Sequence, residues 1–225
     1  AMRFTGAILA DIFMGKVKKW NDSALAELNP GVALPDRDII VVHRSDSSGT
    51  TYVFTEYLTK VNNDWRQHIK FSTSVKWPVG SGQKGNEGVS DSVMKTPGAI
   101  GYTELTYALQ KNLKHGFVRN KEGAYVRGSL ESVTAAAVGA LADIPDDLRY
   151  SLTNMPGKDA YPISGTVWAI VYVKQSAAKG PLLVDFLRWL THDGQQYCQA
   201  LHYASLPEGL IQRIDQKLGQ VKFEN

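Results

Sequence analysis

Short apolar runs alternate with helical segments along this chain, and that alternation restricts the fold more than any other feature. The runs Asp38–His43 and Gly98–Tyr102 have the length of strands that are covered on both faces. Between them, residues 50–61 carry apolar side chains at helical spacing, and residues 86–95 are also expected to be helical. Strands that alternate with helices predict an α/β fold with a mainly parallel or mixed sheet.

The rest of the chain continues the same pattern. Further helices are expected at residues 5–14, 103–111, 129–142, 176–192 and 207–218, and a short one that starts at Asn21 or Ser23 and runs through Leu28. A hairpin is expected at 115–127, and the longest strand at 161–173. Thr5 is a typical N-cap for the first of these helices, and Gly15 is a typical residue at its end.

Composition excludes several classes of protein. The 225 residues are 43% hydrophobic and 21% charged with a net charge of +3, which rules out a disordered chain. No dense basic stretch indicates nucleic-acid binding, and no apolar run has the length of a membrane span. Cys198 is the single cysteine, so neither an intrachain disulfide nor a cysteine-based zinc site is expected. Ala1–Arg3 leads directly into an expected element, without the pattern of a signal peptide.

The segment Val41–Thr51 carries the most informative polar residues. It leads from a buried strand into the start of a helix, where unpaired backbone N–H groups and the helix dipole favour an anion. Arg44 offers a planar fork for phosphate or carboxylate oxygens, while Ser48 and Thr50 add hydroxyl donors. These features predict an oxyanion site. A capped helix in which Arg44 merely pairs with Asp46 accounts for the same residues equally well.

Two other kinds of site fit the sequence less well. Gly80–Gly85 matches the glycine pattern of dinucleotide-binding loops, but the preceding strand is short and contains Pro78, so a mobile loop before the next helix is the better interpretation. A hydrolase that uses Ser48 lacks the nucleophile-elbow pattern, and His43 is interpreted as structural. The other histidines show no metal-ligand spacing, so no metal and no cofactor are expected.

Several distinctive blocks run in order along the chain from about residue 5 to its C-terminus. They are Ala10–Asn21, Asn29–Gly31, Val42–Thr51, Val75–Pro78, Gly85–Asn86, Pro97–Tyr102 and Tyr203–Pro207. Together these blocks resemble one family, the periplasmic phosphate-binding proteins (PstS type) of the phosphate ABC transporter.

The resemblance implies a two-lobed, periplasmic-binding-protein-like fold (type II) that closes on inorganic phosphate, without enzymatic activity. By analogy Arg44 donates to phosphate oxygens and is held by Asp46, while Ser48, Gly49 and Thr50 supply hydroxyl and backbone donors. The natural partners implied are the permease subunits of the inner membrane, and the location implied is the periplasm.

The resemblance also implies that the family's signal peptide and the N-terminal part of lobe one lie outside these residues. We therefore expect residues 1–160 to form a complete phosphate-binding lobe and residues 161–225 to hold a hinge strand and the C-terminal part of the other lobe. Phosphate binding is then expected to be weak, with little discrimination against sulfate. The incomplete lobe is expected to expose apolar surface, and covering that surface with a second copy of the chain favours a homodimer. The alternative function is a form that binds no phosphate and serves as an interaction module that oligomerises.

Overall fold

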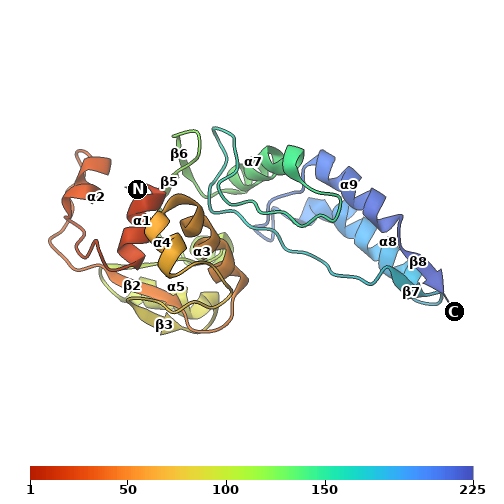
Figure 1. Cartoon of the computed structure of the whole chain (residues 1–225), viewed down its shortest axis with the longest axis horizontal. Coiled ribbons are helices and arrows are strands. Elements are labelled where there is room, and N and C mark those ends of the chain that lie inside the picture. The colour runs from red at the N-terminus through yellow and green to blue at the C-terminus, as the bar shows by residue number, and fades with distance from the viewer. Residues whose placement is uncertain (225) are drawn as a thin grey trace.

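The computed structural model describes residues 1–224, and its N-terminal part contains a three-stranded parallel sheet on one side of the helices α1, α3 and α4 (Figure 1). Its middle strand β2 (Ile40–Arg44) pairs with β3 (Ser81–Gln83) on one side and with β4 (Ala99–Gly101) on the other. Val41 and Val42 are buried, as in a strand that is covered on both faces. This sheet and the helices between its strands confirm the α/β class.

The helices of this part follow the predicted order, except that α4 was not predicted. They are α1 (Gly6–Phe13), α2 (Ser23–Leu28), α3 (Gly49–Val61), α4 (Asn63–His68), α5 (Gly85–Lys95) and α6 (Leu105–Gln110). Thr5 caps α1, because its hydroxyl oxygen accepts a hydrogen bond from the Ile8 N–H. The apolar faces of α1 and α3 meet in the main core, where the Phe13 and Phe54 rings lie 4.7 Å apart between centroids.

A smaller sheet adjoins this core. The strand β1 (Arg3–Phe4) pairs in parallel with β5 (Phe117–Arg119), which forms the predicted hairpin with β6 (Tyr125–Arg127). The helix α7 (Leu130–Ala140) follows and ends in the short 3₁₀ helix η1 (Leu141–Asp143).

The C-terminal residues form a second region at the far end of the molecule (Figure 1). Its elements are β7 (Lys174–Ser176), α8 (Gly180–Thr191), η2 (Asp193–Tyr197), α9 (Glu208–Leu218) and β8 (Lys222–Glu224). A second apolar cluster joins Ala137 and Ala140 of α7 to Leu210 of α9, together with Ile144 and Leu152. Through this cluster, α7 from residues 1–160 packs against α9 from residues 161–225.

The strand predicted for residues 161–173 is wrong. This segment is fully described and contains no strand. At its end, the Val173 carbonyl accepts a hydrogen bond from the Lys222 N–H. The side chains of Ile170 and Tyr172 are 95% and 85% exposed. Its β-branched and aromatic composition suits a strand, but strand formation also needs a neighbouring chain to pair with its N–H and C=O groups. The part of the chain that is described places no such neighbour beside residues 165–172.

The helix expected at 176–192 begins later than predicted. Residues 174–176 pair with β8 instead, so α8 starts at Gly180 with Pro181 in its first turn, a position that proline favours. None of the helices in the described chain is long and apolar enough to cross a membrane.

Candidate anion site

The candidate site lies where β2 ends and α3 begins. Arg44 is the last residue of β2, and Ser48 is the N-cap of α3. The Ser48 hydroxyl oxygen accepts a hydrogen bond from the Thr51 N–H at 3.1 Å, and the Ser48 N–H donates to the Thr73 carbonyl. Ser48 therefore keeps only its hydroxyl proton for a ligand, because its backbone N–H is already engaged.

The Arg44 guanidinium is held on two sides. Its Nε and Nη2 donate to the two carboxylate oxygens of Asp46 at 2.7 and 2.6 Å, and its Nη1 donates to the Asn86 Oδ1 at 3.1 Å. The pairing of Arg44 with Asp46 that the sequence suggested is thus present in the structure. A guanidinium has five N–H donors, so two remain after these three bonds. The Arg44 side chain is only 10% exposed, which keeps its orientation fixed.

The charges of this pair stabilise each other. The hydrogen bonds from Arg44 and from the Gly85 N–H hold the pKa of the Asp46 carboxyl well below its usual range. The hydrogen bond to Asp46 in turn raises the pKa of Arg44. Because Asp46 neutralises Arg44, what remains for an anion is directed N–H groups rather than net charge.

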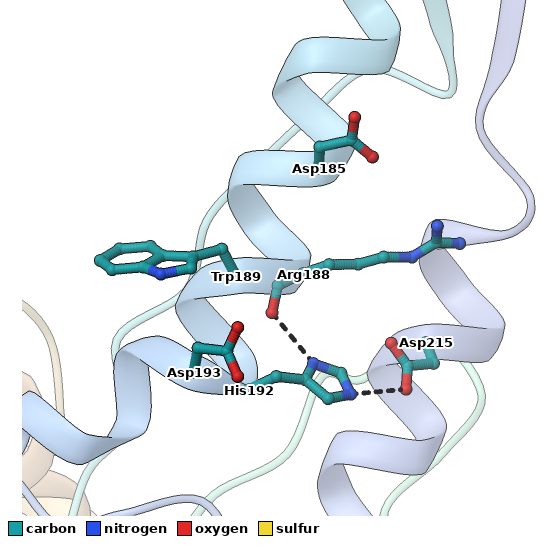
Figure 2. Close-up of a pocket in the computed structure, with 6 residues that line it drawn as sticks. All are labelled: Asp185, Arg188, Trp189, His192, Asp193 and Asp215. Carbon is teal, nitrogen blue, oxygen red and sulfur yellow. Dashed lines mark hydrogen bonds and ion pairs between the residues drawn. The ribbon is translucent and has the colours of Figure 1, made fainter.

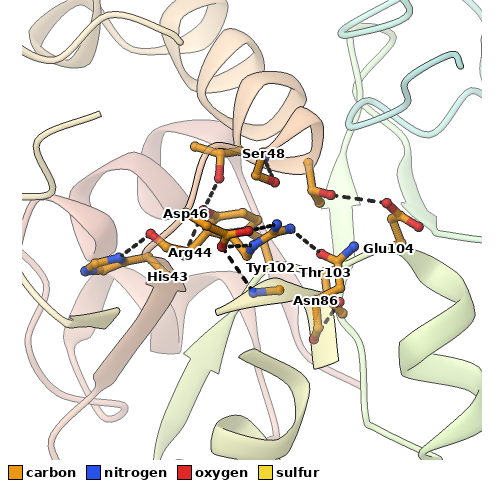
Figure 3. Close-up of polar contacts among 11 residues, drawn as sticks. His43, Arg44, Asp46, Ser48, Asn86, Tyr102, Thr103 and Glu104 are labelled. Atoms are coloured by element: carbon orange, nitrogen blue, oxygen red, sulfur yellow. Dashed lines mark hydrogen bonds and ion pairs between the residues drawn. The ribbon is translucent and has the colours of Figure 1, made fainter. Parts of the chain in front are cut away.

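The first turn of α3 supplies further donors. The N–H groups of Gly49 and Thr50 precede the first possible intrahelical bond and have no acceptor among the described residues. A Cβ atom added at Gly49 would meet no atom within 4 Å, so the first turn of α3 is not covered at this position. Figure 3 shows Arg44, Asp46 and Ser48 close together near this turn. Arg44 at the end of β2 therefore lies near the start of α3, which holds Ser48, Gly49 and Thr50, and Asp46 pairs with Arg44.

Tyr102, which was not predicted from the sequence, contacts the residues behind the site. Its hydroxyl accepts a hydrogen bond from the Arg44 backbone N–H at 3.1 Å and lies 2.6 Å from the Thr51 hydroxyl. Its ring stacks on Phe54 at 4.6 Å between centroids, and burial raises the pKa of its phenol. The available signal was a tyrosine at the carboxyl end of a predicted buried strand, the edge where the ligands of α/β sheets bind.

Asn86 and Glu104 were also missed as neighbours of the site. Asn86 lies in the first turn of α5, where its side chain reaches Arg44. Glu104 is the N-cap of α6, and its Oε1 accepts a hydrogen bond from the Thr50 hydroxyl at 3.3 Å. Only the parallel order of the strands brings the residues after β3 and β4 beside the residues after β2.

The structure supports neither of the two other kinds of site, the dinucleotide loop and the hydrolase that uses Ser48. The glycine segment forms strand β3 rather than a mobile loop, which corrects that interpretation. The start of α5, where a dinucleotide phosphate would bind, is occupied by the Asp46 carboxylate, which accepts the Gly85 N–H at 3.1 Å. His43 stacks on Trp77 at 4.9 Å between centroids and points away from Ser48 (Figure 3), so these two do not form a nucleophile and base pair.

A separate polar pocket lies between α8 and α9 in the C-terminal region (Figure 2). There the His192 Nδ1 lies 2.9 Å from the Arg188 carbonyl oxygen, and its Nε2 lies 3.2 Å from an oxygen of Asp215. None of the residues predicted from the sequence lies here. No cluster of three metal-binding side chains occurs among the residues that the structure describes.

Comparisons with known proteins identify the family of this chain. A family model described as a PBP superfamily domain matches residues 2–193. The phosphate-binding protein PstS of Xylella fastidiosa is 45% identical over 216 residues, which are 95% of this chain and 59% of that protein. PstS of Pasteurella multocida is 43% identical over 216 residues, which are 95% of this chain and 62% of that protein. The chain thus spans about three fifths of the length of these curated relatives.

A solved structure places the chain in the same fold. The structure of a high-affinity periplasmic phosphate-binding protein (PfluDING), bound with phosphate, matches 96% of this chain and 65% of that chain. The TM-score is 0.66 at 22% sequence identity, so this likeness confirms the expected periplasmic-binding-protein-like fold. Because the family model covers far more than half of its residues, the chain belongs to the PBP superfamily, within which it is similar to the PstS phosphate-binding proteins.

Proposed function

We propose that this chain binds inorganic phosphate as part of a solute-binding protein for uptake by an ABC transporter. The phosphate is held by the remaining Arg44 N–H groups, the Ser48 hydroxyl, and the N–H groups of Gly49 and Thr50. Asp46 orients the guanidinium and does not touch the ion. The observation that carries the proposal is the clamped Arg44 beside the first turn of α3, where the Gly49 and Thr50 N–H groups have no acceptor among the described residues.

The remaining parts of the proposal come from similarity to the PstS proteins. They are a periplasmic location, delivery of phosphate to permease subunits of the inner membrane, and binding without catalysis. The last part agrees with the site, because the His43 ring stacks on Trp77 and does not serve Ser48 as a base. The division into a lobe of residues 1–160 and a partial lobe of residues 161–225 belongs to the same proposal.

Isothermal titration with phosphate tests the proposed function through Arg44→Gln. Charge-assisted hydrogen bonds contribute roughly 1.5–3 kcal/mol each, so we expect the variant to bind phosphate about ten- to a hundredfold more weakly. Arg149→Gln is the matched control, because its side chain is 88% exposed and lies outside the site. Equal affinity of Arg44→Gln and the unchanged chain would contradict the proposal.

A second candidate function is an interaction module that assembles with another copy of the chain and binds no phosphate. The observation that favours it is the exposure of large apolar side chains in the C-terminal region, such as Ile170 at 95% and Leu182 at 70%. Titration separates the two functions, since the second predicts no saturable heat with phosphate. The anion site favours the first, because an interaction module needs no clamped arginine beside the first turn of a helix.

A further inference from the structure

The helix α8 carries apolar side chains on two opposite faces. One face packs against the C-terminal region itself, where Val184 is buried and Leu183 and Leu187 are half-buried. Phe223 of β8 packs on the start of this helix, where a Cβ atom added at Gly180 would lie 2.5 Å from its ring. A helix that is apolar on all sides normally lies inside a core. The other face of α8 should therefore be covered as well.

The second face of α8 is a continuous stripe of exposed apolar side chains. Four exposed residues recur at helical spacing and therefore lie on one side of the helix. They are Leu182, Phe186, Trp189 and Leu190. The Phe186 and Trp189 rings stack at 6.0 Å between centroids, and the Tyr197 ring of η2 lies 6.2 Å from Trp189. These five residues are called the α8 stripe below.

The area of the α8 stripe fits the apolar part of a dimer interface. Its residues are between 43% and 70% exposed, which amounts to roughly 100 Å² each and about 500 Å² in one copy. A stable interface buries about 800 Å² on each partner, and roughly 65% of that area is apolar in homodimers. The stripe by itself supplies this apolar share.

Two opposite charges mark the ends of the α8 stripe. Lys179 is the N-cap of α8, seven residues before Phe186, and Asp193 follows the helix, seven residues after Phe186. Both are exposed, and no ion pair joins either of them to another described residue. Figure 2 shows Asp193 on the same side of α8 as Trp189, opposite the Arg188 side chain. The stripe therefore has a positive end and a negative end.

We propose that the α8 stripe binds the α8 stripe of a second copy of this chain, with the two helices antiparallel about a two-fold axis at Phe186. A two-fold axis lets one patch serve both copies. Phe186 then meets the partner's Phe186, and Leu182 meets the partner's Leu190. The interface uses none of the residues of the anion site, so this inference goes beyond the proposed function and does not depend on it.

The two charges favour the antiparallel orientation. In this pair, Lys179 of each copy lies beside the partner's Asp193, so opposite charges meet at both ends. A parallel pair would place Lys179 beside the partner's Lys179 instead. The dipole of a helix favours an anion at its N-terminus and a cation at its C-terminus, which is the reverse of what α8 carries. An antiparallel partner supplies the favoured charge at both ends.

Exchange of the two charges tests the orientation. We expect Lys179→Asp and Asp193→Lys each to raise the dissociation constant of the dimer about tenfold, because each change brings like charges together at both ends. The double change, which exchanges the two charges, should restore the dissociation constant of the unchanged chain. Light scattering over a series of concentrations measures this constant. Lys121→Asp is the matched control, an equal charge reversal at an exposed position of the β5–β6 hairpin, and should leave it unchanged.

Phe186→Glu tests the apolar stripe itself. A charge at the two-fold axis meets its own copy in the partner, so we expect this variant to have the mass of a single chain at micromolar concentration. Val138→Glu in α7 is the matched control, because Val138 is 53% exposed and Phe186 is 54% exposed. The control should keep the dimer. Circular dichroism checks that each variant keeps its helices.

Three results would overturn the proposal. They are a monomeric mass of the unchanged chain, a dimer that persists in Phe186→Glu, and a dimer that neither charge reversal weakens. Weakening by each single reversal, with recovery in the double change, supports the antiparallel pair. Phosphate titration of Phe186→Glu should match that of the unchanged chain, so phosphate binding and pairing through α8 succeed or fail separately.

Discussion

At the scale of single residues, Asp46 decides which donors of Arg44 remain for a ligand. Its carboxylate binds the side of the guanidinium at 2.7 and 2.6 Å, and Asn86 accepts from Nη1. A free arginine side chain has many rotamers, and fixing it in advance removes part of the entropy cost of binding. The exposed fraction of the Asp46 side chain is 34%, so water still screens this pair.

The lowered pKa of Asp46 predicts a pH dependence of stability. A carboxyl whose pKa is lower in the folded chain stabilises it above the unfolded value of about 3.9, and this contribution disappears as the pH falls through the folded value. We expect Asp46→Asn to lower Tm at neutral pH and to approach the unchanged chain below about pH 4. Thermal unfolding followed by circular dichroism measures this. A Tm difference that stays constant from neutral to acidic pH would show that the ion pair contributes nothing.

Sequence alone identifies some residues of the site and not others. Arg44, Asp46, Ser48, Gly49 and Thr50 are neighbours along the chain, so one strand-to-helix motif indicated all of them. Asn86, Tyr102 and Glu104 are 42, 58 and 54 positions from the groups they contact. Only the pairing of β2 with β3 and β4 brings them there, and no local pattern states that pairing.

At the scale of elements, caps fix where the helices begin. Ser48 caps α3 at the anion site, and Ser129 caps α7 in a capping box with Ser132. Both serines make the same kind of bond to the backbone N–H three residues on, at 3.1 and 3.2 Å. The two positions therefore form a matched pair for separating stability from binding.

Removing either cap should destabilise the fold by a similar amount, whereas only removal of the Ser48 cap should weaken phosphate binding. Ser48→Ala and Ser129→Ala are each expected to cost about 1 kcal/mol of unfolding free energy in urea titrations. Ser48→Ala should also weaken phosphate binding, since it removes a hydroxyl donor. Equal phosphate affinity of the two variants would mean that the Ser48 hydroxyl only caps the helix.

Most elements were predicted where the local pattern is sufficient, and two of the failures share one cause. The helices α1, α3, α7 and α9 carry caps or apolar spacing that identify them without a partner. The segment 161–173 and the glycine segment before α5 depended instead on whether another strand lies alongside. The apolar composition of 161–173 favours a strand, and the glycines before α5 favour a loop. The structure has the reverse, because β2 pairs with the glycine segment and no strand pairs with 161–173 in the described chain.

At the scale of the whole molecule, the N-terminal and C-terminal regions differ in how completely they bury their large apolar side chains. The N-terminal core fully buries large side chains such as Trp65 and Tyr57. In the C-terminal region, one face of α8 exposes Leu182 at 70% and Phe186 at 54%, and the preceding segment exposes Ile170 at 95%. Exposed apolar surface costs roughly 25 cal/mol per Å², so association with a second copy would be favourable.

This uncovered surface predicts a homodimer. Light scattering at micromolar concentration should give twice the mass of one chain. A charge placed in the interface should return the mass to that of a monomer, as in the double change Ile170→Lys and Leu182→Glu. Val32→Lys, at a side chain 48% exposed in the N-terminal part, is the control and should leave the dimer intact. A monomeric mass of the unchanged chain would contradict the prediction.

The sequence by itself determined the α/β class, the order of most elements and the segment that carries Arg44 and the start of α3. These follow from periodicity, caps and side-chain chemistry, which act over a few neighbouring residues. Only the tertiary structure decided that Asn86, Tyr102 and Glu104 surround that segment, and that residues 161–173 lie extended without a paired strand. The physical reason is that pairing and packing join groups far apart in the chain, and their energies depend on which surfaces the fold brings together.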